Sequence, residues 1–64
     1  MGDYGPEVRK ILTDNGCWFV RRGKGDHDIW RSPNAPRPFT VPQTIKSRHT
    51  ANGILKDAGL PKAF

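Results

Sequence analysis

The histidine at position 27 lies where a side chain could carry acid–base chemistry, directly after a glycine- and lysine-rich turn in the stretch RRGKGDHDIWR. Imidazole titrates near physiological pH, so it can accept or donate a proton. Arg22, Lys24 and Arg31 could hold a phosphodiester against His27, and Gly25 would let a backbone approach closely. This combination suits RNA cleavage, in which a deprotonated 2′-hydroxyl attacks its own phosphate. A histidine in a basic loop is more often an ordinary surface residue, so composition and spacing alone leave both interpretations open.

The second histidine, His49, follows Arg48 near the start of a stretch with helical spacing. Asn52 and Lys56 follow Arg48 at i+4 and i+8, which places the three on one stripe of a helix. The stripe could be the solvated face of an amphipathic helix or a surface that contacts RNA. If this helix begins near the turn, His49 could be a second acid or base.

Other reactive residue types are sparse. Cys17 is the only cysteine, so no intramolecular disulfide can form, and we expect it to be a small buried hydrophobic residue. The two histidines are far apart and the carboxylates are scattered, so no cluster has metal-ligand spacing. The GKG segment lacks the Lys-Ser/Thr frame of a phosphate-binding loop. We therefore expect neither a metal site nor a cofactor.

The charge of the chain points to a polyanionic partner. Its 64 residues form one small domain, 1–64, with 11 Lys and Arg against 6 Asp and Glu and a formal net charge of +5. Nucleic acid is the first candidate, and a merely solvated basic surface is the alternative. The N-terminal residues lack an apolar signal region, and no run is long enough to span a bilayer. We expect a soluble, cytoplasmic protein.

Two stretches predict helices. Pro6 suits the opening turn of a helix over about residues 5–15, in which apolar residues recur at helical spacing. Ser47 is a suitable N-cap for a second helix over about residues 48–58, which Gly59 would end.

The middle of the chain predicts strands. CWFVRR and HDIWRS, joined by GKGD, are typical of a β-hairpin, and FTV forms a third short strand that ends at Pro42. The order is then α-β-β-β-α, an α+β fold. Two amphipathic helices need one apolar surface, so we expect both on one face of a three-stranded antiparallel sheet, with the other face in water.

Alternation along the strands assigns side chains to the two faces. Trp30 is the largest apolar side chain of the second strand and should face the helices, which leaves His27 and Arg31 on the open face. On the first strand, Cys17 and Phe19 compete with Trp18 and Val20 for the inward positions, and we expect Cys17 and Phe19 to point inward. Phe39 and Val41 of the third strand should join the core.

The stretches VRKILTDNGCWFVRRGKGDHDIW, FTVP and TANGILKDAGL together resemble the HicA (YcfA-like) family, small bacterial mRNA interferase toxins of type II toxin–antitoxin systems. The resemblance implies an α-β-β-β-α fold similar to double-stranded-RNA-binding domains. It also implies a Gly-Ser-His-like motif, here Gly25, Asp26 and His27, whose histidine is needed for RNA cleavage. Translated mRNA would be the target, and a HicB-type antitoxin would block the active face.

Two positions depart from the family pattern. Asp26 replaces the usual small hydroxyl residue, and a carboxylate at this point would repel a phosphate and alter activity. The family's frequent histidine shortly after Val-Pro is absent, because Gln43 and Thr44 stand there. His49 is the only histidine downstream.

Overall fold

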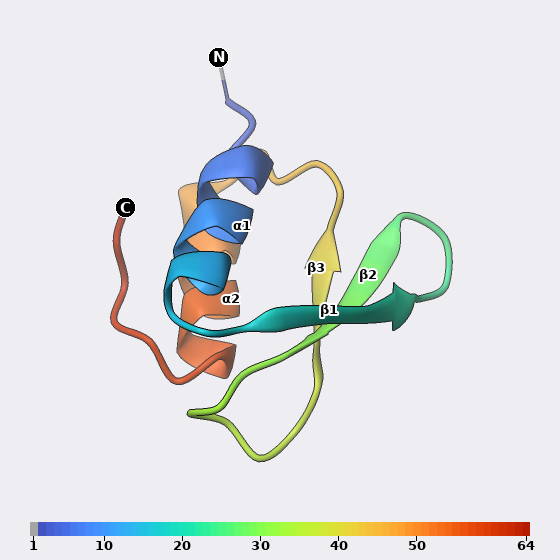
Figure 1. Cartoon of the computed structure of the whole chain (residues 1–64). Coiled ribbons are helices and arrows are strands. Elements are labelled where there is room, and N and C mark those ends of the chain that lie inside the picture. Colours follow the sequence, from blue (N-terminus) through green and yellow to red (C-terminus); the bar gives the residue numbers. More distant parts are fainter. Residues whose placement is uncertain (1) are drawn as a thin grey trace.

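The computed structural model describes residues 2–64, which form two helices and a three-stranded antiparallel sheet (Figure 1). The predicted α+β class and the α-β-β-β-α order are confirmed. Within residues 2–64, no helix has the length and apolar character needed to cross a membrane. The elements are α1 (Gly5–Asp14), β1 (Trp18–Arg22), β2 (His27–Arg31), β3 (Phe39–Pro42) and α2 (Arg48–Asp57).

The ends of the helices follow from local chemistry. Pro6 lies in the first turn of α1, where its missing N–H removes no helical hydrogen bond. The Ser47 hydroxyl caps α2 by accepting a hydrogen bond from the backbone N–H of His49 at 3.1 Å. After α2, Gly59 has φ +78°, and a Cβ there would lie 2.6 Å from the carbonyl oxygen of Asn34. Only glycine therefore satisfies both the backbone conformation and the space.

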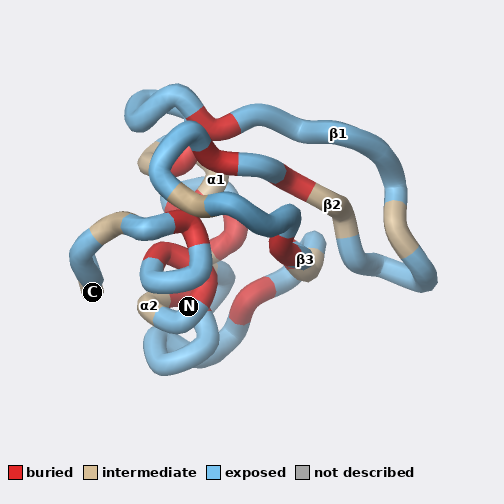
Figure 2. Tube along the Cα trace, turned by 90° about the horizontal axis from the view of Figure 1, so that it is seen from below, coloured by how far each residue is buried: buried red, intermediate tan, exposed pale blue. Residues whose placement is uncertain are grey.

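The core lies between the two helices and one face of the sheet. Trp30, Phe39 and Val41 of the sheet are buried against apolar side chains of both helices, as predicted. Cys17 is also buried, with 5% of its surface exposed. Figure 2 shows these buried segments gathered on the helix side while β1 is exposed along its length. The remaining core residues are Val8, Leu12, Ile45, Ala51, Ile54, Leu55 and Ala58.

A β-bulge in β1 decides which side chains share a face. Trp18 is opposite Arg31, but the pairing shifts between Phe19 and Arg21, so Val20 has no partner on β2. One extra residue reverses the alternation for the rest of a strand. Beyond the bulge, Arg21 therefore joins the open face and Arg22 the helix face.

Phe19 is only partly where the sequence predicted it. It pairs with Trp30 and lies on the helix side, where the two rings meet edge to face with centroids 6.4 Å apart. However, 51% of Phe19 is exposed, so it borders the core and is not buried in it. The reason is that β1 is an edge strand beyond the area that the helices cover.

The Asp3 carboxylate joins the first residue of α1 to the segment that precedes α2. One carboxylate oxygen accepts hydrogen bonds from the backbone N–H of Gly5 at 2.8 Å and of Ile45 at 3.1 Å. The bond from Gly5, followed by that from Ile45, lowers the pKa of Asp3 from its ordinary value. A lowered folded-state pKa means that the ionised carboxylate stabilises the fold above the unfolded pKa, and that this stabilisation is lost as the pH falls through the folded value.

We expect Asp3→Asn to lower the free energy of unfolding at neutral pH and to flatten its decline below about pH 4. Urea denaturation at a series of pH values measures both effects. Glu7→Gln is the control, because the Glu7 carboxylate makes no hydrogen bond or ion pair within residues 2–64. An acid decline in Asp3→Asn as steep as in the wild type would remove Asp3 from this role.

Gly53 lies inside α2, and a Cβ built there meets nothing within 4 Å. No close packing therefore requires a glycine at this position. We expect Gly53→Ala to raise the free energy of unfolding by about 0.8–1 kcal/mol through helix propensity, measured by chemical denaturation. Gly59→Ala should instead lower the free energy of unfolding. A lower free energy of unfolding in Gly53→Ala would contradict the prediction, because it would show that the exposed surface of α2 tolerates no added methyl group.

Candidate functional site

The hairpin turn, residues 23–26, holds His27 at the start of β2. The backbone N–H of Gly23 donates to the His27 carbonyl at 2.7 Å, and the His27 N–H donates to the Lys24 carbonyl at 3.3 Å. Gly25 has φ +63°, a conformation that favours glycine, and its missing Cβ leaves open space. The turn is thus closed by backbone bonds while its outer side stays accessible at Gly25.

His27 is exposed and lies opposite Pro42 of β3. The backbone N–H of Gln43 donates to the Asp26 carbonyl at 2.9 Å, so the end of β3 also holds the turn. The side chains of β2 alternate, which places His27 with Ile29 and Arg31 on the face opposite Trp30. The imidazole therefore reaches solvent from a turn whose backbone is fixed on both sides.

The open face of the sheet is the surface on His27's side of the strands. Ladder partners share a face, so the pairing assigns its members directly. Asp28 is the only carboxylate within the strands, and it lies on the other face. The open face therefore combines cations, a histidine and apolar surface with no acidic strand residue. Its members are Trp18, Arg21, His27, Ile29, Arg31, Thr40 and Pro42.

Three of the predicted RNA-binding residues belong to this region. Lys24 and Gly25 are exposed in the turn, and Arg31 is exposed on the open face. The Arg31 guanidinium makes a long hydrogen bond to the Pro36 carbonyl at 3.4 Å. Arg21 was not among the RNA-binding residues predicted from the sequence, but it shares the open face with His27. Only the bulge brings it there, and no glycine marks the bulge in the sequence.

Arg22 is held on the helix side of the sheet. Its Nε lies 3.4 Å from a carboxylate oxygen of Asp28, whose side chain is 15% exposed. With the Gln43 amide oxygen facing the guanidinium, that oxygen also accepts from Arg22 at 2.9 and 3.2 Å. The Gln43 carbonyl in turn accepts from Arg9 of α1 at 3.2 Å. Arg22 thus ties the hairpin to the residue that follows β3, and the carbonyl of that residue is bonded to Arg9 of α1.

The residues predicted on α2 lie apart from the hairpin turn. Arg48, His49 and Lys56 are exposed on α2. In both overall views α2 and the hairpin turn lie at opposite sides of the molecule (Figures 1 and 2). Asn52 of the same stripe binds the backbone of residues 63 and 64 and is therefore not part of a free polar surface. The roles proposed for the α2 side chains stay predictions.

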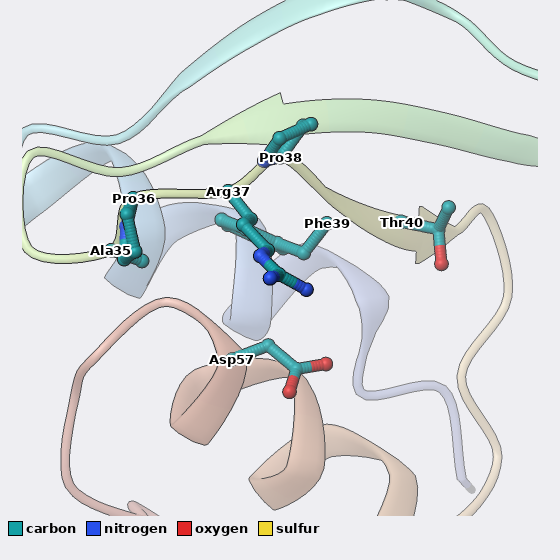
Figure 3. A pocket seen from close by; sticks show the side chains of 7 residues that line it. All are labelled: Ala35, Pro36, Arg37, Pro38, Phe39, Thr40 and Asp57. Atoms are coloured by element: carbon teal, nitrogen blue, oxygen red, sulfur yellow. The ribbon is translucent and has the colours of Figure 1, made fainter.

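A pocket of about 500 Å³ lies between the proline-rich loop and the end of α2 (Figure 3). The Arg37 side chain points toward the Asp57 carboxylate across it, and Phe39 lines it. Neither histidine borders this pocket, so it lacks the acid–base group of the hairpin turn. Among residues 2–64, no group of three or more His, Cys, Asp or Glu could hold a metal ion.

The fold and the site define a small basic α+β protein with an exposed histidine at a glycine turn beside a cationic sheet face. The family model described as "HicA toxin of bacterial toxin-antitoxin" matches residues 5–60, and the chain belongs to this HicA toxin family. No curated protein and no solved structure matches the chain. The likeness to double-stranded-RNA-binding domains therefore stays a prediction.

The two neighbouring arginines of β1 should differ in their effect on stability. Arg22→Ala leaves the largely buried Asp28 carboxylate without its cation, so we expect the free energy of unfolding to fall by about 1 kcal/mol. Arg21→Ala is the matched control and should change it by no more than about 0.5 kcal/mol. Chemical denaturation measures both, and equal losses would contradict the assignment of the two side chains to opposite faces.

Proposed function

We propose that this toxin is an endoribonuclease that cleaves mRNA without a metal ion, with His27 as its general acid and base. The observation that supports this most is the placement of an exposed imidazole at a glycine turn, beside a sheet face that carries arginines and no carboxylate. Family membership supports a toxin role, and RNase activity is known for the family in general.

The proposed reaction needs only the imidazole and the RNA. His27 takes the proton of a 2′-hydroxyl, and the resulting oxygen attacks the adjacent phosphorus. The bond to the 5′-oxygen of the next nucleotide breaks, and the imidazolium or water returns a proton to that oxygen. The products are a 2′,3′-cyclic phosphate and a free 5′-hydroxyl. DNA has no 2′-hydroxyl and would not be cleaved.

The cations beside His27 would hold the phosphates. Lys24 projects from the turn, while Arg21 and Arg31 lie on the open face with His27. Gly25 leaves its outer side open, so the RNA backbone could approach the turn closely. Arg21 takes the place that the sequence reasoning gave to Arg22, because Arg22 is paired with Asp28 on the helix side.

Membership of a toxin–antitoxin family implies pairing with an antitoxin. We propose a HicB-type protein that covers the hairpin turn and the open face. The positive charge of this surface favours an acidic binding segment, and burial of His27 would stop RNA from reaching it. Translation would resume once the antitoxin bound the toxin.

A second candidate function is a non-catalytic RNA-binding module. Asp26 favours it, because an exposed carboxylate next to His27 repels the phosphate that would have to react. Such a module would bind RNA in a salt-dependent way, would cleave none and would not arrest growth when expressed.

We expect purified protein to cleave single-stranded RNA in EDTA, and His27→Ala to lower the rate by about 100-fold or more. His49→Ala is the matched control and should retain most of the activity, since α2 lies apart from the turn. The 3′ fragments should carry a 5′-hydroxyl. Equal cleavage by wild type and His27→Ala would remove His27 from the mechanism, and salt-sensitive binding with no cleavage would select the non-catalytic module.

A further inference from the structure

Trp18 is a large exposed side chain that the proposed cleavage does not use. It is the first residue of β1, lies on the open face with 48% of its surface exposed, and has Arg31 as its ladder partner. The other tryptophan, Trp30, is 7% exposed and belongs to the core. Packing therefore accounts for Trp30 and leaves half of Trp18 in water, which costs hydrophobic free energy in a domain this small.

The surroundings of Trp18 identify the ligand that this indole suits. Arg31 lies directly opposite and Ile29 diagonally across the ladder, while Arg21 is on the same face beyond the bulge. The carboxylate of Asp28 is on the other side of the sheet. A flat aromatic surface on the same face as two arginines, with no acidic strand residue on that face, matches an unpaired nucleobase whose neighbouring phosphates are negatively charged.

We propose that Trp18 is a stacking platform for a base of single-stranded RNA, with Arg31 and Arg21 holding the adjacent phosphates. The proposal rests on the proposed function, because it takes RNA as the substrate. His27 and Arg31 are the two ends of β2, which places them about 13 Å apart at about 3.3 Å per residue. A strand whose reacting phosphate is at His27 thus runs along the open face to reach Trp18.

The geometry of β1 favours a nucleic acid over a protein strand. β1 is an edge strand, and its exposed edge could in principle pair with another chain. The bulge at Val20 interrupts the regular spacing of backbone groups that strand addition needs. A second copy of the protein would also bring a net charge of +5 against an equal charge. Stacking requires neither a regular edge nor a neutral surface.

The test uses a fluorescently labelled 2′-O-methyl oligonucleotide, which cannot be cleaved through the 2′-oxygen, and an abasic strand of the same length and charge. Trp18→Ala should bind the strand with bases about 5- to 150-fold more weakly, and the abasic strand as tightly as wild type does. Trp18→Phe should recover much of the loss. Phe19→Leu, which changes an aromatic residue of similar exposure on the other face, should alter binding less than about 2-fold.

Unchanged binding in Trp18→Ala, or an equal loss on the abasic strand, would overturn the platform. A dimer in sedimentation that Trp18→Ala dissociates, with RNA binding unchanged, would assign the surface to a second copy and also overturn it. The two proposals can fail separately. If binding depends on Trp18 but the wild type cleaves no RNA, the stacking platform is supported and the nuclease proposal fails. If the wild type cleaves RNA but binding does not depend on Trp18, the nuclease proposal is supported and the platform fails.

Discussion

The pairing of β1 with β2 across the bulge is the constraint on which the arrangement of the surface depends. Before the bulge Trp18 faces the solvent and Phe19 the helices, and after it Arg21 faces the solvent and Arg22 the helices. Without the extra residue the two arginines would exchange faces. Arg22 would then lose Asp28, and that carboxylate would remain on the helix side without its cation. The bulge therefore gives the hairpin its internal ion pair and places Arg21 on the open face, while the alternation of β2 keeps the Asp28 carboxylate off that face.

The two faces of the sheet have different roles, because one face contributes to stability and the other is available for binding. All of the larger buried side chains lie between the helices and one face of the sheet, so the opposite face contributes little to the core. Residues on that face are free to serve a ligand because the fold does not need them. The hairpin turn lies at the edge of both regions, held by backbone hydrogen bonds from Gly23, His27 and Gln43. The imidazole can therefore be exposed and still be well positioned.

The sequence predicted the features that depend on local chemistry or on strong periodicity. Both helices, the Ser47 cap and the inward position of Trp30 follow from spacing and residue type, and the structure confirms them. The face of Arg22 could not be predicted, because a bulge without glycine leaves no mark in the residue pattern. The exposure of Phe19 could not be predicted either, because an edge strand can expose an aromatic residue that alternation places inward. The pocket beside Arg37 and Asp57 needed the tertiary fold, because it joins a loop to a helix far along the chain.

The hydrogen bond from Ile45 to Asp3 spans 42 positions of sequence and encloses the whole sheet. The three strands, by contrast, meet only their neighbours along the chain. Contacts between sequence neighbours lose less loop entropy than contacts between distant segments. The strand meander therefore closes short loops, whereas the Asp3 carboxylate closes a long one and so loses more chain entropy when it joins the segments that precede α1 and α2.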